Sequence, residues 1–486
     1  MQRNRHDRLM TPTPTPPVAV DTLVERLRAL GAAPLPPDVA TLTRTYLVDS
    51  IGVGLAGTIT PENRALLAVA AYWEGPATTS TLWGRAVMTG PLTAAMVNAH
   101  SIHGLEFDCV HEGAVLHPFT VVLPVLAAHT QRVAASGRHI SGDQFLRALA
   151  LGVELACRLG EAATTGLRFF RPATAGHLGA TLALGLLDGR DHDQLVAALG
   201  VAFGQASGSM QSHREGSPLL ALQMSFAARN ALCSHDLAGA GFTGPRAMLE
   251  PPLGYFGLIE EAGDVDRLLS DIGGDDARWE LRRVSHKPFP SGRATHATLS
   301  TLRDLRLRHR LSIDDVASIE LTVPPLIHHL VGRGSTSTMT APYARLCIPF
   351  LAGLLLRDGD LTVDALTPTN LADAQLLAFG AERVTVRVSD PAMDPNAFVP
   401  QRVVLTATDA RRFEVTVTDT LGSPTHPLTP QQHLGKANSN AEACARYGGV
   451  VVDMAAVAET VEGIGRMGDI NELWAILGAD VNAGAA

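Results

Sequence analysis

From about residue 20 to residue 272, apolar residues recur with a spacing near 3.6, which predicts one helix after another. Gly and Pro separate these segments and mark their ends. Ala and Gly are abundant within them, which predicts closely packed helices because small side chains let two helix axes approach. The pattern is clearest in TLVERLRAL, VATLTRTYLVDSIGVGLAG, GPLTAAMVNAHSIHGL, FTVVLPVLAAHTQRVAAS, GDQFLRALALGVELACRLGEA and MSFAARNALCSHDLAGAG.

The pattern changes after about residue 273, where polar and apolar residues alternate in β-branched segments. Such alternation predicts strands with one solvated face, in WELRRVS, VASIELTVP, RVTVRVSD, RVVLTATD and RFEVTVTD. Helical segments lie between them, and the chain becomes helical again after about residue 425. We therefore expect a mainly α fold with an α+β second domain. The expected division is a tail over 1–19, a helical domain over 20–272, a smaller α+β domain over 273–424 and a helical return over 425–486.

Composition narrows the class of protein. Of the 486 residues 46% are hydrophobic, enough for a large core, and the net charge of −9 comes without a clustered basic face, which argues against nucleic-acid binding. The five cysteines form no CxxC pair, as expected for free thiols in a reducing compartment. No apolar run approaches the ~18 residues of a membrane span. We expect a cytoplasmic protein without a membrane segment.

The segment HGLEFDCVHEGAVLHPF, residues 103–119, concentrates groups that handle protons. His103 and Glu106 are three residues apart and would share a helix face, whereas Asp108, His111 and His117 fall in the following loop. Imidazole can both accept and donate a proton near neutral pH, so the cluster favours acid–base catalysis. Capping of a helix end is the alternative for any one residue. No metal-ligand spacing such as HExxH occurs, so no metal is expected.

A second cluster, SHKPFPSGRATHATL, covers residues 285–299. Two prolines stiffen the loop, and Ser291 and Gly292 lead into a helix. Backbone N–H groups and Arg293 would there form a cradle for a carboxylate, with His296 one turn further on. The alternative is a capped helix with solvated charges. A third stretch, GSMQSHREGSPLLALQ (208–223), is either a substrate loop or an ordinary connection.

Several segments, in this order along the chain, resemble the MmgE/PrpD family. They are LVDSIGVGLAG (47–57), STLWGRAVMTGPLTAAMVNAHSIHGLEFD (80–108), HPFTVVLPVLAA (117–128), HKPFPSGRATHATL (286–299) and ARLCIPFLAGLLL (344–356), and the resemblance runs from about residue 20 to 475.

The family includes 2-methylcitrate dehydratase, cis-aconitate decarboxylase and an iminodisuccinate epimerase. The resemblance implies a helical domain with an α+β lid, a site between the two, a homodimer, and catalysis without an organic cofactor. His117 and His296 match the two catalytic histidines of the decarboxylase. A Lys and a His of the family's third stretch correspond to Leu220 and Gln223, and a family His-Pro corresponds to Arg171 and Pro172.

The resemblance and the residues together predict a cofactor-independent hydro-lyase that removes a proton beside a carboxylate of a small hydroxy acid. An epimerase, a decarboxylase or a non-catalytic homologue are the alternatives. His117 and His296 would be the acid and base, and Lys287 and Arg293 would hold the substrate carboxylate. The supporting residues are expected to be Glu106, Asp108 and His111, which would orient or tune His117, and His103, Ser291, Gln223 and Arg171, which would bind substrate.

Overall fold

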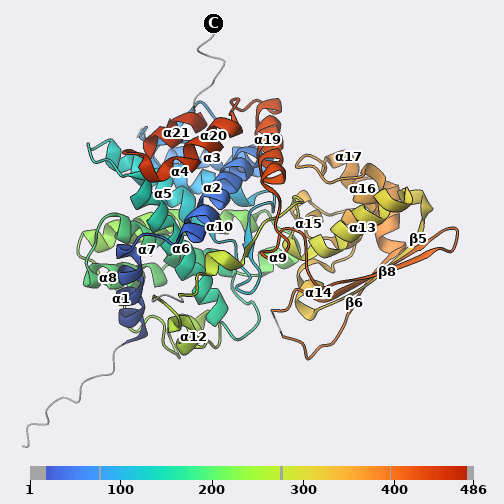
Figure 1. Cartoon of the computed structure of the whole chain (residues 1–486), viewed down its shortest axis with the longest axis horizontal. Helices are drawn as coiled ribbons and strands as arrows, with labels where there is room; N and C mark the ends of the chain where they lie inside the picture. Colours follow the sequence, from blue (N-terminus) through green and yellow to red (C-terminus); the bar gives the residue numbers. More distant parts are fainter. Residues whose placement is uncertain (1–17, 76–77, 274–276, 395, 479–486) are drawn as a thin grey trace, which may run out of the picture.

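The computed structural model describes residues 18–75, 78–273, 277–394 and 396–478. Figure 1 shows helices from both ends of the chain gathered in one body, and a four-stranded sheet with its own helices beside it. The expectation of a mainly helical protein with a smaller β component is confirmed. Whether the part that carries the sheet closes as a lid stays a prediction. No helix among the described residues is long and apolar enough to cross a membrane.

The helical body is built from long helices with local start signals. Proline occupies the first turn of several of them, and Ser141 and Asp191 form capping boxes that satisfy N–H groups at the starts of two others. The helices are α1 (Ala19–Ala32), α2 (Pro37–Gly57), α3 (Pro61–Glu74), α4 (Pro91–His103), α5 (Phe119–Ala134), α6 (Gly142–Ala162), α7 (Arg171–Leu187), α8 (His192–Phe203), α9 (Gln211–Glu215), α10 (Leu219–Gly239), α11 (Tyr255–Leu258) and α12 (Val265–Leu269).

Small residues set the distance between the central helices, as the sequence predicted. α6 and α7 pack face to face, and a Cβ built on Gly179 would lie 2.3 Å from the carbonyl oxygen of Gly152. A side chain at either position would therefore push the two helices apart, which explains why glycine is needed at this contact.

The last helices return to the body in which the chain began. α19 (Pro430–Arg446) packs along α2, where a Cβ on Gly52 would lie 3.2 Å from the Cα of Ala437. α20 (Met454–Glu462) contacts both α2 and α19, and α21 (Asn471–Gly478) packs on α5. Figure 1 shows the red α19 and α20 beside the blue α2.

The smaller part holds one four-stranded sheet. The strands β5 (Val316–Val323), β6 (Val384–Val388), β7 (Gln401–Ala407) and β8 (Arg412–Val417) follow the order β6-β5-β7-β8, with β5 and β6 parallel and the other pairs antiparallel. Alternating burial along β5 shows one face on the core and one toward water. Its helices are α13 (His296–His309), α14 (Pro325–Val331), α15 (Ala341–Ala344), α16 (Ile348–Asp358), α17 (Pro368–Leu371) and α18 (Ala374–Glu382).

One predicted strand was wrong. WELRRVS forms mainly a short 3₁₀ helix over Glu280–Arg283, and only Val284–Ser285 is extended, as strand β4. β4 pairs with β3 (Val110–His111), so that Val110 lies opposite Ser285. A pairing between two dipeptides far apart in the sequence leaves no periodic signal. It nevertheless brings the two clusters found in the sequence side by side.

The remaining short strands, β1 (Ser80–Thr81) and β2 (Met88–Thr89), pair with each other.

Candidate active site

The first cluster is presented at the end of α4. The helix ends at His103, and the N–H of Gly104 donates to the carbonyl of His100 at 2.7 Å. Glu106 then adopts a left-handed backbone conformation with φ of 52°, which is unusual for a residue with a side chain. This tight turn places the carboxylates of Glu106 and Asp108 on the same side as His103, with which both interact.

Asp108 lies at the centre of the cluster and is fully buried. One of its oxygens lies 3.1 Å from Nδ1 of His103 and 3.2 Å from Nδ1 of His117, and it also accepts a hydrogen bond from Thr120 at 2.5 Å. Lys287, from the second cluster, donates to the carbonyl and to the carboxylate of Glu106 at 2.9 and 3.0 Å. The ammonium is 3.8 Å from Asp108 as well.

These contacts fix the charges of the cluster. Burial alone would raise the pKa of Glu106, but Lys287, His103 and His117 outweigh it and lower that pKa to about 2. Burial would likewise raise the pKa of Asp108, yet the two histidines hold it well below its usual value. Burial acts to lower the pKa of His103, and the two carboxylates overcome this and raise it. The carboxylates are therefore ionised, and His103 favours its charged form.

His117 is different, because burial together with Lys287 and His103 lowers its pKa despite the opposing effect of Asp108. Its ring is therefore neutral at neutral pH. Nδ1 faces two acceptors, the Asp108 carboxylate and the carbonyl of Cys109 at 3.2 Å, so this nitrogen carries the hydrogen. Nε2 is left with a free lone pair, 4.0 Å from the nearer oxygen of Glu106. His117 thus has the protonation and orientation of a general base.

A cavity of about 60 Å³, referred to below as the His117 cavity, opens beside this ring. It lies where both parts of the chain meet, and its lining is mainly apolar. The lining residues are Glu106, Val110, Val115, His117, Leu167, Phe170, Pro172, Met210, His213, Gly292, Arg293, Ala294, Leu330, Val331, Leu346 and Phe398.

The second imidazole in the lining is His213, which sequence reasoning did not select as a site residue. It lies on α9, within the stretch that could equally have been an ordinary connection. Nδ1 of His213 accepts from the guanidinium of Arg333 at 3.2 Å, and burial and this cation lower the pKa of His213 to about 3. Arg333 has a further nitrogen that is buried without a partner among the described residues. Only the run of polar residues in 208–223 pointed to His213.

The expected convergence of His117 and His296 on one cavity is not observed. His296 is fully buried and does not line the His117 cavity, and its Nε2 hydrogen-bonds to the carbonyl of Ser291 at 3.2 Å. Its ring packs against Phe289, and burial holds its pKa well below the usual value. His296 is the first residue of α13, and Gly292, four residues before it, lines the cavity instead.

The predicted carboxylate cradle is already occupied by the protein. Arg293 lines the His117 cavity, but its guanidinium binds Glu112 at 2.7 Å and three carbonyl oxygens, of His286, Leu421 and Thr420. The hydroxyl of Ser291 bonds to Thr295, and the N–H of Gly292 donates to the carbonyl of Arg345. These groups are not free to hold a substrate. Their role here is to join the second cluster to the rest of the chain.

Three further candidates lie in the protein interior outside the cavity lining. Nε2 of His111 is 2.9 Å from Glu280, and Arg171 binds Glu260 at 2.8 Å. Gln223 accepts from the N–H of Ser209 and donates to Ser212, and so fixes the loop that leads to His213. Arg171 forms a buried ion pair, and His111 forms a buried hydrogen bond to Glu280. Gln223 can act only through the residues it positions.

Another buried cation borders the cluster on its other side. Arg345 is 6% exposed, and no described residue forms a hydrogen bond or ion pair with its guanidinium. Burial lowers its pKa to about 10, so it stays charged at neutral pH. It lines a small space together with His103 and Glu106, and with Leu220, the residue found where a family Lys was expected. The arginine lay in ARLCIPFLAGLLL, where the strong apolar pattern concealed it.

Comparison with known proteins agrees with the resemblance. The MmgE/PrpD N-terminal domain matches residues 21–267, and the MmgE/PrpD C-terminal domain matches residues 289–449. The chain belongs to the MmgE/PrpD family. Within the family it is similar to the cis-aconitate decarboxylase of Aspergillus terreus, with 31% identity over 231 residues. That match covers 47% of this chain and 47% of the Aspergillus enzyme.

Other relatives match over a greater length at lower identity. Human cis-aconitate decarboxylase is 26% identical over 353 residues, 71% of each chain. The cis-aconitate decarboxylase-like protein oryM of Aspergillus oryzae is 26% identical over 405 residues, 79% of this chain and 83% of that protein. The similarity to these MmgE/PrpD relatives therefore extends over both parts of the fold.

Proposed function

We propose that the chain is a lyase of the MmgE/PrpD family that decarboxylates a small unsaturated di- or tricarboxylic acid without an organic cofactor. One observation carries the proposal: a neutral imidazole, His117, is oriented by Asp108 and faces an apolar cavity. The similarity to several cis-aconitate decarboxylases supports it.

The apolar lining favours loss of carbon dioxide. A carboxylate is poorly solvated among Val110, Leu330 and Leu346, whereas neutral carbon dioxide is not penalised there. The C–C bond breaks, its electron pair stays on the remaining carbon, and that carbon must then receive one proton. The net change is one carboxylate and one proton converted into one C–H bond and one carbon dioxide.

His117 is our candidate for the proton carrier. An anionic substrate next to the ring raises the pKa of His117, so that the bound complex holds the proton on Nε2. Asp108 stabilises the resulting imidazolium through Nδ1, and His103 on the other side of Asp108 favours its charged form already. His117 then delivers its proton to carbon and returns to the neutral state.

Two cations are available for the other carboxylates of the substrate. Arg345 and Arg333 have guanidinium nitrogens that no described acidic residue pairs with, in contrast to Arg293. They would replace the charge that Leu220 does not supply. The His117 cavity of about 60 Å³ is too small for a whole six-carbon acid, so side chains or the sheet-bearing part must move on binding. Such a movement is the lid closure that the family resemblance implies.

A hydro-lyase is the second candidate, because the same neutral His117 could remove an α-proton. Dehydration also needs an acid for the leaving hydroxyl, and His213 is the other imidazole in the cavity. Because its pKa is lowered to about 3, His213 is neutral at neutral pH and is not in the protonated form that a general acid needs. We therefore prefer decarboxylation. An epimerase needs two bases and meets the same difficulty.

Proton NMR in heavy water on a panel of hydroxy and unsaturated di- and tricarboxylates separates these functions. Decarboxylation of cis-aconitate releases carbon dioxide and places one deuterium on carbon. Dehydration forms a double bond with loss of water, and epimerisation exchanges a proton without either change. No turnover of any acid in the panel would favour a non-catalytic homologue and contradict the proposal.

A further inference from the structure

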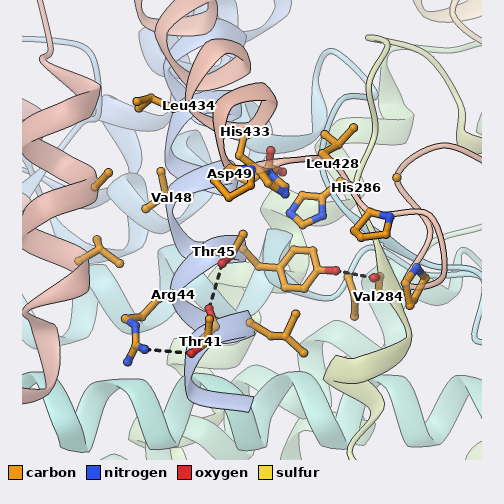
Figure 2. Close-up of a pocket in the computed structure, with 18 of the residues that line it drawn as sticks. Thr41, Arg44, Thr45, Val48, Asp49, Val284, His286, Leu428, His433 and Leu434 are labelled. Carbon is orange, nitrogen blue, oxygen red and sulfur yellow. Dashed lines mark hydrogen bonds between the residues drawn. The ribbon is translucent and has the colours of Figure 1, made fainter. Parts of the chain in front are cut away.

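A second group of titratable side chains lies outside the candidate active site. Asp49 on α2, His286 in the loop after β4 and His433 on α19 each offer one potential ligand atom, and these atoms all lie within 4.8 Å of one another. Figure 2 shows the three side chains pointing toward one another in the wall of a cavity. That cavity has a volume of about 600 Å³.

The polar atoms of this group have few partners. His286 is 4% exposed and Asp49 is 5% exposed, yet Nε2 of His286, one carboxylate oxygen of Asp49 and Nδ1 of His433 are buried without a hydrogen-bond partner among the described residues. Buried polar atoms are normally satisfied, because an unmade hydrogen bond costs on the order of 1–3 kcal/mol. Three such atoms in one place form the donor set of a candidate ligand site.

In the other groups of similar composition among the described residues, most of the histidine nitrogens are bonded within the group or to a neighbour. In the group of His129, Asp188 and His235, each histidine donates to the aspartate at 2.9 Å. His111 and Glu280 are joined in the same way at 2.9 Å, and arginines neutralise the acidic residues around them. The cluster around Asp108 is held together by its own hydrogen bonds and by Lys287, and Nε2 of His103, which has no hydrogen-bond partner, lies 3.3 Å from the carboxylate of Glu106. Among the groups of the described residues, that of Asp49 has an unpartnered nitrogen on each of its two rings.

We propose that Asp49, His286 and His433 bind a divalent transition-metal ion such as Zn²⁺, with an open coordination position toward the cavity. Two imidazoles and one carboxylate are a ligand set that zinc accepts, and three protein ligands leave room for water or a small ligand.

The geometry and the charges are compatible with this ion. Zinc–ligand bonds of about 2.0–2.2 Å require ligand atoms about 3.3 Å apart, so the side chains must close by roughly 1.5 Å at most. Lys436 pairs with the other oxygen of Asp49, at 2.8 Å, and leaves the unpartnered oxygen available.

An ion at this position would connect distant segments of the chain. α2 and α19 belong to the helical body, whereas His286 directly precedes Lys287, whose ammonium holds Glu106. The ring of His286 also stacks on Tyr46, with ring centroids 4.2 Å apart. Metal binding would therefore stabilise the loop that presents Lys287 to the active site.

The test compares two histidine variants of the full-length protein. His433→Ala removes a ligand that is only partly buried, so the fold should be retained, as circular dichroism would verify. His426→Ala is the matched control, because His426 is an exposed histidine near the same cavity and does not line it. Each protein is stripped with a chelator and titrated with ZnCl₂ by calorimetry. Visible absorption of the Co²⁺ form then reports on nitrogen ligands.

Wild type and His426→Ala are expected to bind one zinc ion with equal affinity and to gain thermal stability. His433→Ala should bind that ion at least about 100-fold more weakly, since loss of even an indirect ligand contact costs about 10- to 100-fold. Equal zinc binding in His433→Ala would place the ion elsewhere and overturn the proposal. The proposal would also be wrong if the wild-type protein bound inorganic phosphate at this site and bound no zinc.

Discussion

The replacement of Lys287 by Met tests how the charges of the active site are balanced. Lys287 is one of only two lysines in the chain, it is fully buried, and its ammonium lies 3.0 Å from Glu106. Met keeps the apolar stem and removes the charge. Two buried carboxylates then face His103 and His117 without the cation that now neutralises Glu106.

The structure gives both the size and the pH dependence of the effect. Folding lowers the pKa of Glu106 from 4.5 to about 2, which corresponds to on the order of 3 kcal/mol of stability at neutral pH. In wild type this contribution is present above pH 4.5 and is lost as the pH falls toward 2. Breaking a buried ion pair by removing one partner costs about 3–5 kcal/mol, so Lys287→Met should lose an amount of this order at neutral pH.

The cost of the substitution should also depend on pH. Without the ammonium, only His103 and His117 oppose burial, so the pKa of Glu106 moves upward from its position in wild type. A carboxyl with a higher pKa in the folded protein takes up its proton at a higher pH. The variant therefore becomes more stable relative to wild type as the pH falls. We therefore expect the destabilisation to be greater at pH 8 than at pH 5.

Urea unfolding at pH 5, 6.5 and 8 measures this difference. Lys436→Met is the control, because it removes the other lysine, which pairs with Asp49 outside the cluster. The ammonium of Lys436 donates to the carbonyl of Phe107 and does not contact Glu106, so this variant reports the cost of losing the other lysine charge. The reasoning is refuted if Lys287→Met is destabilised equally at pH 5 and pH 8.

Four further substitutions test the assignment of roles by steady-state kinetics on the best substrate of the panel. His117→Asn should lower kcat by about 10²–10⁴-fold with little change in unfolding, as loss of a general acid or base does, and near-normal turnover would exclude the proposed role. His213→Asn should reduce kcat/KM. His296→Asn should lower the unfolding midpoint and leave kcat/KM of the folded fraction close to wild type. If His296→Asn instead reduced kcat/KM and His213→Asn did not, His296 would be the second catalytic histidine. Arg345→Ala should raise KM at least about 10-fold, because it removes a charged hydrogen-bond donor worth about 1.5–3 kcal/mol, and an unchanged KM would show that the substrate does not reach this guanidinium.

Periodicity was sufficient to locate the main elements. α2, α6 and α13 and the four strands of the larger sheet lie where the sequence pattern predicted them, because each buries a face whose spacing is visible in the chain. The prediction of a strand at WELRRVS was wrong because no such spacing exists there. The extended part is two residues long, and its partner is about 170 positions away. Short, long-range pairings of this kind carry no local signal.

The sequence by itself determined the family, the helical and mixed segments, and the group formed by His103, Glu106, Asp108 and His117, because those residues are close in the chain and lie at one helix end. Only the tertiary structure decided which distant groups join them. It brought Lys287 to Glu106 and His213 to the cavity, and it turned the ring of His296 into the interior. The direction of a side chain depends on where its helix begins and on what packs against it. Neither is fixed by residue type or spacing.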